Sequence, residues 1–490
     1  MNESADKQYL LALDAISIAS LIKKRDITVE ACITVFTEHI QEINKELNAV
    51  VEERFDEALQ EAKELDAKIA SVHLDHYPLY GVPISIKEAI DVKNMKTTGG
   101  LPQRKDIMKT EDAEVVEKLK NAGAIILGKT NTPALCFCQE TDNKLYGRTN
   151  NAWNPKHTAG GSSGGEAALI AAGGAALGIG SDIGGSIRFP AHLNGTVGFK
   201  PGKFQVSNTG HLPVNRLPLK ARMNSIGPLT KSIRDAKLIY QLTQKKETHR
   251  KYYEKMQVDM LPTDSGYPLD DATTALMHDL YNFLKPMAEV NWSFPPYFTD
   301  TSKVWQEIMS IDGASDIKRV AFNDDRPNIW KHYIQEKLTG KTSIHSYLTW
   351  ALLGANIFKP NDKRLKEIKS FLEEGDHALE RHLNNRLLIF PVYHTSGLNH
   401  GDLFKEIFSL SKSYLKYMPY VAYANIWGLP SLTIPVNSNP NKNPISIQIM
   451  SGIGNEETIF NLGEVIEQQY SGYRRSTMYD KSPIRSSEKI

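Results

Sequence analysis

The chain has 490 residues, with 58 Lys or Arg against 57 Asp or Glu, so its formal net charge at pH 7 is +1. Hydrophobic residues make up 41% and charged residues 23%, which is ordinary for a globular protein and argues against wholesale disorder. Because no basic excess is available to displace counterions, nucleic acid is not an expected partner. The three cysteines, Cys32, Cys136 and Cys138, are too few for a disulfide framework. They favour a reducing compartment, and we expect a cytoplasmic protein.

The N-terminal region contains no pattern typical of a targeting segment. Residues 1–26 carry acidic residues early and an apolar stretch that Asp14 interrupts, which is typical of an amphipathic helix. The longest run of low polarity, 167–180, is too short to cross a bilayer and indicates a buried core helix.

The first half of the chain alternates between helical and strand patterns. Residues 5–70 are predicted to be helical, with apolar residues at three- and four-residue steps over 28–47 and a short strand over 48–51. Apolar and other residues alternate through 79–92, as in a strand. A helix is predicted over 112–122, then a strand over 124–127 and a turn at 128–129. This alternation indicates an α/β layered fold.

The second half begins with a charged, aromatic and mostly helical region over 245–385. We interpret it as an elaboration and not as a separate domain, because strand patterns resume at 387–392, 431–436 and 445–449. A last helix is predicted over 455–470, with Asn455 as its cap. The polar tail from 471 to 490 is expected to be loosely held.

Two serines in glycine-rich settings compete as nucleophiles. Residues 160–202 contain 13 of the 33 glycines, a density typical of loops that approach a reacting group closely. Ser162 lies in a G-x-S-x-G pattern, but the polar segment before it does not suit the strand that a nucleophile elbow requires. Ser186 follows two consecutive glycines, whose N–H groups can point inward together and form an oxyanion hole.

Several long motifs make the chain recognisable. The segment GGSSGGEAALIAAGGAALGIGSDIGGSIRFPAHLNGTVGFKP at 160–201 resembles the signature region of the amidase signature family. Together with LCFCQETDNKLYGRTNNAWNP at 135–155, it is most similar to the fatty acid amide hydrolase branch. The resemblance extends through GVPISIKEAIDV, NSIGPLTKSIRDA, GLPSLTIPV and PISIQIMSG, and it thins out over 245–385.

The resemblance implies one large α/β domain over 1–490, in which helices cover both faces of a mixed central β-sheet. Within it we expect N-terminal helices over 5–70 and a catalytic core over 79–240. A helical elaboration that lines or caps the substrate site would span 245–385, and the core would resume over 386–470, before the tail at 471–490.

The resemblance also implies a Ser–Ser–Lys triad. Ser186 would be the nucleophile, Ser162 the bridging serine and Lys87 the terminal base. Lysine accepts a proton only when it is neutral, so its pKa must fall from about 10.4 towards 7 through desolvation. A serine between lysine and nucleophile can accept one hydrogen bond while it donates another. The family pattern further implies a cis peptide bond between Gly161 and Ser162.

The implied substrate-binding groups are neighbours of these residues in the sequence. The backbone amides of Ile183, Gly184, Gly185 and Ser186 would form the oxyanion hole. Cys136 falls where the substrate-contacting loop of the family runs, and Ser162 would also face the substrate.

Each assignment has an alternative from the residue pattern alone. Lys87 could be a snorkelling residue at a strand edge. Ser162 could be the N-cap of the following helix, with Glu166 in its first turn. The glycines could serve tight packing or an anion site. His192, His211 and His394 could suggest a Ser-His-Asp triad, but no motif fixes such a role, and a structural hydrogen-bonding role is favoured for Arg188.

We predict a serine amidase that hydrolyses linear amides through an acyl-enzyme. Its expected substrates carry a sizeable apolar acyl chain, as fatty acid amides and N-acyl amines do. Alternatives are an amidase for small aliphatic or aryl amides, the glutamine-hydrolysing subunit of a tRNA-dependent amidotransferase, and an inactive binding protein on the same scaffold. No cofactor and no metal are expected, because Cys136 and Cys138 lack a second Cys/His cluster. The apolar segment 344–358 could line an acyl channel, touch a membrane surface or be a buried core helix. A homodimer is left open.

Overall fold

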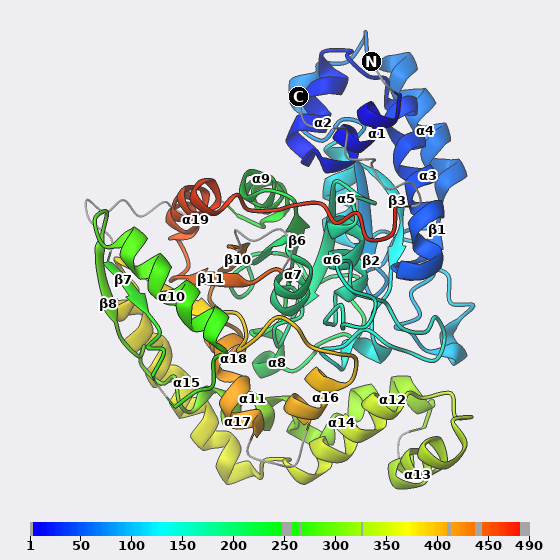
Figure 1. Cartoon of the computed structure of the whole chain (residues 1–490). Coiled ribbons are helices and arrows are strands. Elements are labelled where there is room, and N and C mark those ends of the chain that lie inside the picture. Colours follow the sequence, from blue (N-terminus) through cyan, green and yellow to red (C-terminus); the bar gives the residue numbers. More distant parts are fainter. Residues whose placement is uncertain are drawn as a thin grey trace.

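The computed structural model describes residues 3–246, 257–264, 266–324, 327–408, 413–436 and 443–480. Within this part of the chain, eleven strands form one sheet that runs across the whole molecule (Figure 1). In sheet order the strands are Val50–Glu53 (β1), Ile125–Thr130 (β3), Pro83–Lys87 (β2), Leu177–Asp182 (β4), Ser225–Thr230 (β6), Val197–Lys200 (β5), Ser431–Pro435 (β10), Ser446–Met450 (β11), Arg386–Pro391 (β9), Gln257–Met260 (β7) and Glu289–Trp292 (β8).

The sheet is mixed. Strand β2 pairs in parallel with β3 and β4, and β7 pairs in parallel with β8 and β9. The centre, from β4 through β6, β5, β10 and β11 to β9, is antiparallel. The predicted α/β class with one large domain and a mixed central sheet is confirmed.

Helices precede, connect and follow these strands. Those of the first half are Glu3–Ala12 (α1), Ala15–Lys23 (α2), Val29–Leu47 (α3), Phe55–Lys68 (α4), Glu114–Asn121 (α5), Gly164–Ala171 (α6), Arg188–Asn194 (α7), Pro218–Ala221 (α8) and Ile233–Thr243 (α9). Those of the second half are Asp271–Leu284 (α10), Thr301–Met309 (α11), Ser315–Phe322 (α12), Ile329–Thr339 (α13), Ser346–Ile357 (α14), Asp362–His382 (α15), Asp402–Phe408 (α16), Ser413–Tyr417 (α17), Pro419–Ile426 (α18) and Glu456–Tyr470 (α19). In Figure 1, α12, α13 and α14 lie together at the bottom of the view, far from α1 to α4.

Helices cover both faces of the sheet. On β5, the ring of Phe199 packs against Tyr240 of α9 and Phe460 of α19, with ring centroids 5.1 and 4.7 Å apart. The preceding residue, Gly198, lies against Ala191 of α7. Because successive residues of a strand point to opposite faces, α7 lies across the sheet from α9 and α19.

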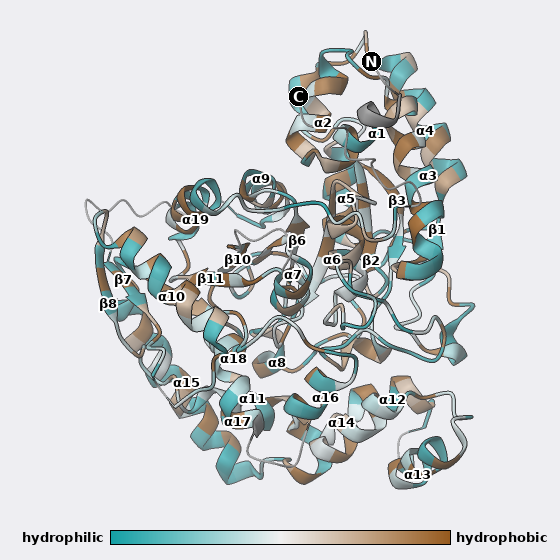
Figure 2. Cartoon of the chain, viewed as in Figure 1, coloured by the Kyte–Doolittle hydropathy of each residue, from teal (hydrophilic) through white to brown (hydrophobic). Residues whose placement is uncertain are grey.

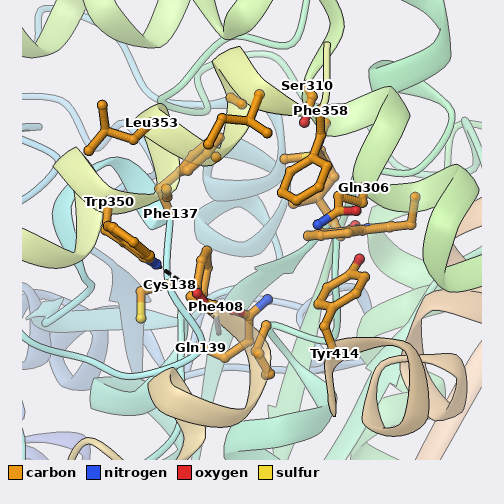
Figure 3. Close-up of a pocket in the computed structure, with 18 of the residues that line it drawn as sticks. Phe137, Cys138, Gln139, Gln306, Ser310, Trp350, Leu353, Phe358, Phe408 and Tyr414 are labelled. Carbon is orange, nitrogen blue, oxygen red and sulfur yellow. Dashed lines mark hydrogen bonds between the residues drawn. The ribbon is translucent and has the colours of Figure 1, made fainter. Parts of the chain in front are cut away.

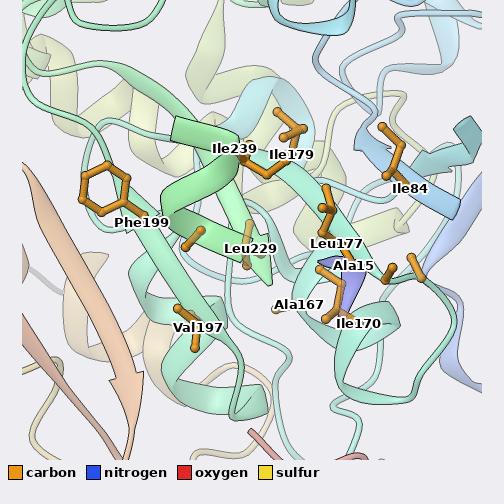
Figure 4. Packing of buried hydrophobic residues seen from close by; sticks show 14 of the residues in the cluster. Ala15, Ile84, Ala167, Ile170, Leu177, Ile179, Val197, Phe199, Leu229 and Ile239 are labelled. Carbon is orange, nitrogen blue, oxygen red and sulfur yellow. The ribbon is translucent and has the colours of Figure 1, made fainter. Parts of the chain in front are cut away.

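The largest hydrophobic core lies between the sheet and its covering helices (Figure 4). Isoleucine, leucine and valine side chains of the central strands, such as Ile84, Leu177 and Leu229, meet those of α6 and α9, such as Ile170 and Ile239. Outer helices such as α10 and α15 alternate hydrophobic and hydrophilic surface, as expected for elements buried on one side (Figure 2).

The sequence predicted several elements closely. Helix α3 begins directly after Thr28, whose hydroxyl accepts a hydrogen bond from the Ala31 N–H at 3.1 Å. The predicted strands near 387–392, 431–436 and 445–449 are β9, β10 and β11. Among the described residues, no helix is both long and apolar enough to cross a membrane.

Two predictions about secondary structure were wrong, and a third, that of a mostly helical region over 245–385, was incomplete. Residues 128–129, predicted as a turn, continue β3, because their backbones pair with β1 and β2. The run 167–180 is not one helix: α6 ends at Ala171, a turn at Gly173 follows, and β4 begins at Leu177. The region 245–385 contributes two strands, β7 and β8, which extend the sheet beyond β9.

Two predictions near the C-terminus also need correction. Asn455 precedes α19, but its side chain does not cap it; the amide donates to the carbonyl of Leu383 at 2.9 Å. The tail is packed as far as residue 480: the Ser476 N–H donates to the carbonyl of Ala171 at 2.8 Å. Residues 481–490 lie outside the described part of the chain.

Candidate active site

Lys87 is the last residue of β2, a strand buried along its whole length between β3 and β4. Its side chain is fully buried, and Nζ lies 2.7 Å from Oγ of Ser162 and 3.0 Å from Oγ of Ser181. Burial lowers the pKa of the Lys87 amine, because the charged form loses its hydration. The snorkelling alternative is therefore wrong, since the amine does not reach solvent.

Ser162 lies in the loop that leads into α6, and the Gly161–Ser162 peptide bond is cis, as the resemblance implied. A Cβ at Gly161 would lie 2.8 Å from the backbone of Gln139 and Glu140, so only glycine fits there. Ser162 is not the N-cap of α6; that position is taken by Ser163, whose side chain makes no capping hydrogen bond.

Glu166, in the first turn of α6, is buried and accepts hydrogen bonds from the hydroxyls of Ser85 at 2.5 Å and Thr130 at 2.7 Å. Burial raises the pKa of its carboxyl to about 8, despite these bonds. Its side chain thus links α6 to β2 and β3 beneath the candidate site.

The segment 183–186 follows β4 and carries the four amides expected in an oxyanion hole. The carbonyl of Ile183 accepts a hydrogen bond from Nε1 of Trp305 at 2.7 Å, so the N–H of Gly184, across the same trans peptide, points away from Trp305. The Gly185 N–H donates to Oδ1 of Asp182 at 2.8 Å. Because that donor is already engaged, the expected set of four free amides is reduced to those of Ile183, Gly184 and Ser186.

Ser186 lies close to the other two expected residues without completing a chain of hydrogen bonds. Its carbonyl accepts from the Ser163 N–H at 3.1 Å, and its side chain lines a cavity that Ser162 also lines. Within the described residues, no hydrogen bond joins the hydroxyls of Ser162 and Ser186. Catalytic hydrogen bonds are often loose before substrate binds.

A buried ion pair between Asp182 and Arg188 fixes the loop 183–186. The fully buried guanidinium of Arg188 binds both carboxylate oxygens of Asp182 at 3.0 Å, and Asn425 donates to the same carboxylate at 2.8 Å. Burial would raise the pKa of Asp182, but Arg188 outweighs it and holds that pKa well below its usual range. Arg188 is a structural hydrogen-bonding residue, as predicted.

The sequence did not indicate how two polar residues, Ser181 and His211, lie next to Lys87. Ser181 lies on β4, next to Asp182, and contacts Nζ of Lys87. His211 lies in the loop after β5, and its Nε2 is 2.8 Å from Oγ of Ser181. Nothing in the local pattern around His211 marks this contact, because it depends on a strand 30 residues earlier in the chain.

Cys136 lies beside this cluster with a backbone φ of +59°. Its Sγ is 3.3 Å from Oγ1 of Thr132. Burial would raise the pKa of the Cys136 thiol, but the nearby Lys87 amine and His211 outweigh burial and lower that pKa to about 6. Cys136, which the resemblance places at the substrate, is therefore also near enough to the candidate base to affect its charge.

Two cavities meet at Ser186. The larger, of about 1000 Å³, is lined mainly by aromatic and aliphatic side chains of α11, α13, α14, α16 and α17, with Gln139, Gln306 and Ser310 among the few polar ones (Figure 3). The smaller, of about 320 Å³, has Ser162, Ser181, His211, Asn215 and Asn224 among the residues that line it. Cys136, Phe137, Ile183, Ser186 and Met309 line both.

The remaining candidates lie away from this junction. His192 is buried and bonded to the backbone of Thr395 and Ser446, and His394 pairs with Glu406. Cys138 is buried at the edge of the larger cavity. In the described ranges, no three His, Cys, Asp or Glu side chains form a group that could hold a metal ion.

Comparison with known proteins agrees with this fold. The sequence model of the amidase family matches residues 31–460, and the chain belongs to that family. It is 29% identical to fatty-acid amide hydrolase 2-B of Danio rerio over 496 aligned positions, which cover 95% of this chain and 90% of the relative. It is 28% identical to indoleacetamide hydrolase of Bradyrhizobium diazoefficiens, with coverage of 93% and 86%.

Solved structures show the same fold. A 6-aminohexanoate cyclic dimer hydrolase with substrate superposes with a TM-score of 0.79 at 21% identity, covering 96% of this chain and all of the other. A fatty acid amide hydrolase superposes with a TM-score of 0.77 at 18% identity, covering 94% and 86%. The protein is an amide-hydrolysing enzyme of the amidase signature type.

Proposed function

We propose that this enzyme hydrolyses amides of apolar carboxylic acids through an acyl-enzyme on Ser186, with Ser162 as the bridging serine and Lys87 as the base. The observation that carries the proposal is the buried hydrogen bond between Lys87 and Ser162, next to a cavity that Ser186 also lines. Burial lowers the pKa of Lys87, which favours the neutral amine that a base requires.

The proton path follows from these contacts. The neutral amine of Lys87 accepts the hydroxyl proton of Ser162, while Ser162 accepts that of Ser186 and the Ser186 oxygen attacks the substrate carbonyl. The Lys87 ammonium then returns a proton through Ser162 to the leaving amine as the C–N bond breaks. Water repeats the attack on the acyl-enzyme and releases the acid.

The developing oxyanion would be bound by backbone N–H groups of Ile183, Gly184 and Ser186. Hydrogen bonds from Trp305 and Gln139 to the carbonyls of Ile183 and Gly184 fix the peptide planes of this loop, at 2.7 and 3.3 Å. Donors that are fixed before the reaction need no reorganisation when charge develops, which is why they stabilise the transition state.

The two cavities suggest how the substrate is oriented. The larger cavity is apolar enough to bury an acyl chain, and Figure 3 shows Phe137, Leu353 and Phe358 around it. The smaller cavity also reaches Ser186, and its amide and hydroxyl groups suit a small polar amine. The fatty-acid amide hydrolases among the relatives support the same substrate class.

A panel of straight-chain primary amides and ethanolamides, of increasing acyl length, tests the proposal on the purified protein alone. We expect kcat/KM to rise with chain length until the chain fills the larger cavity. Ser186→Ala and Lys87→Met should abolish turnover. Best activity on acetamide or benzamide would favour a small-amide amidase. Activity on glutamine that requires partner subunits and tRNA would favour the amidotransferase subunit, and no turnover at all would favour a binding protein.

The proposed route for an apolar substrate includes peripheral contact with a membrane. The middle of 344–358 is core, but its end is exposed at Ile357, and α13 exposes Trp330, Ile334 and Leu338 at four-residue steps. Leu338 is 80% exposed. Such a stripe suits a lipid surface.

Flotation with phosphatidylcholine vesicles tests this contact. We expect recovery of the wild-type protein with lipid, loss of recovery in Leu338→Glu, and no change in Met108→Glu. Met108 is a suitable control because it is 54% exposed and lies outside α13 and α14. No recovery of the wild-type protein would refute the contact.

A further inference from the structure

His211 is a buried histidine whose two ring nitrogens both have polar partners. Nδ1 lies 3.1 Å from the carbonyl of Pro213, and Nε2 lies 2.8 Å from Oγ of Ser181. Its backbone forms an antiparallel bridge with Ile90, in the segment that follows β2. Hydrogen bonds therefore hold the ring on both sides. Its backbone partner, Ile90, lies three residues after Lys87.

These partners decide the tautomer of the ring. A carbonyl oxygen only accepts hydrogen bonds, so Nδ1 must carry the proton. In the neutral ring, Nε2 is then an acceptor, and it accepts a hydrogen bond from the hydroxyl of Ser181. The oxygen of Ser181 is thus left as an acceptor toward Nζ of Lys87, 3.0 Å away.

The direction of this hydrogen bond fixes the orientation of the amine. A neutral lysine amine has two N–H groups and one lone pair. If one N–H is donated to Ser181, the lone pair can face Ser162, whose Oγ is 2.7 Å from Nζ. Without His211, the Ser181 hydroxyl could rotate and donate to the same lone pair, in competition with Ser162.

We propose that His211 is a positioning residue that, through Ser181, turns the lone pair of the Lys87 amine toward Ser162. This inference rests on the proposed role of Lys87 as the base. His211 itself touches neither Ser162 nor Ser186 in any hydrogen bond among the described residues, and it acts on the reaction only through Ser181 and Lys87.

Other ionisable groups also face Lys87 and bear on its titration. They come from three parts of the chain: Cys136 from the turn Ala134–Cys136, Glu166 from α6 and Asp182 from β4. Because His211 also lowers the pKa of the Cys136 thiol, the pH profiles of the His211 variants are compared in a Cys136→Ser background. A change in profile there reports on the hydrogen bond between His211 and Ser181.

Two substitutions separate the positioning role from a purely structural one. In His211→Gln, the side-chain amide reaches the place of Nε2 and can accept from Ser181. In His211→Asn, the shorter amide replaces Nδ1 and can donate to Pro213, but leaves Ser181 without its acceptor. We expect the Asn variant to lose about 10-fold in kcat with little change in KM, and the Gln variant to recover most of that loss.

The pH profile gives a second readout. When Ser181 donates to the Lys87 lone pair, it stabilises the neutral amine, so the acid limb of kcat/KM should move to lower pH in His211→Asn. Ser181→Ala should remove the difference between the Asn and Gln variants. Thermal unfolding of each variant checks that the fold is kept.

The opposite ranking, with Asn active and Gln impaired, would overturn the inference and assign His211 a structural role through Pro213. Equal activity of all variants would also overturn it, while turnover that depends on Ser186 and Lys87 would leave the proposed function intact. Turnover at the wild-type rate in Lys87→Met would refute both the role of His211 and the proposed function.

Discussion

The loop that carries the proposed oxyanion donors has no room for a side chain at Gly184. A Cβ placed there would lie 2.4 Å from Cζ2 of Trp305, where ordinary contacts are 3.4–4 Å, so the ring would have to move by about 1 Å. Trp305 is 8% exposed and holds the Ile183 carbonyl through Nε1. Gly184→Ala therefore forces the loop and Trp305 apart.

Two effects of Gly184→Ala can be estimated. Overpacking of this kind lowers the free energy of unfolding by about 1–3 kcal/mol. Displacement of a positioned oxyanion donor costs about 10²–10³ in kcat. Because the apolar cavity is unchanged at its far end, we expect KM for a long-chain amide to change much less than kcat. Steady-state kinetics and urea unfolding measure the two effects separately.

Gly354→Ala is the matched control. Gly354 lines the same cavity from α14, and a Cβ there would meet nothing within 4 Å. Alanine is a better helix former than glycine by up to about 1 kcal/mol, so this variant should be as stable as the wild type or more so, with kcat retained. Equal kcat in Gly184→Ala and Gly354→Ala would refute the assignment of the loop.

Three further changes test other parts of the structure. Alkylation of Cys136 by iodoacetamide at neutral pH should be slower in Lys87→Met than in the wild type, because the protonated Lys87 amine lowers the pKa of the Cys136 thiol, whereas burial keeps Cys138 a thiol; equal rates would contradict this. Arg188→Met should cost about 3–5 kcal/mol in urea unfolding, because Asp182 is left buried and unpaired, and a loss under 1 kcal/mol would be inconsistent with that ion pair. Leu353→Trp should lower kcat/KM for the longest acyl amides by about 10-fold or more and spare short ones, and an equal loss for both would place the chain elsewhere.

The sequence predicted best the parts of the fold in which local pattern and structure agree. The alternation around Lys87 identified β2, and the glycines around Ser162 and Ser186 identified loops that approach other backbone closely. Motif resemblance then related these three residues to one another, although 75 residues separate Lys87 from Ser162.

The missed strands have a physical explanation. β7 and β8 are only four residues long, and each mixes polar with apolar residues, as Asp259 and Glu289 illustrate. Short strands of this kind form because β9 offers an edge for pairing, so their β-structure depends on tertiary context. Similarly, Gly128 and Lys129 look like a turn until two neighbouring strands pair with them.

The hydrogen bonds that link Lys87 to Ser181 and His211 were not predictable from local pattern either. His211 lies in an irregular loop, and its partner Ser181 is a strand residue next to the better-marked Asp182. A histidine in a loop has no periodicity to indicate which strand it will meet. Only the packing of that loop against β2 and β4 makes it a neighbour of the candidate base.

The most direct test of the proposed chemistry is to locate the covalent adduct formed with a fluorophosphonate, by peptide mass spectrometry of the treated protein. We expect a single adduct on Ser186, none in Ser186→Ala, and much slower formation in Lys87→Met. Modification of Ser162 or Cys136 instead, or an unchanged rate without the lysine, would show that another group attacks the substrate carbonyl.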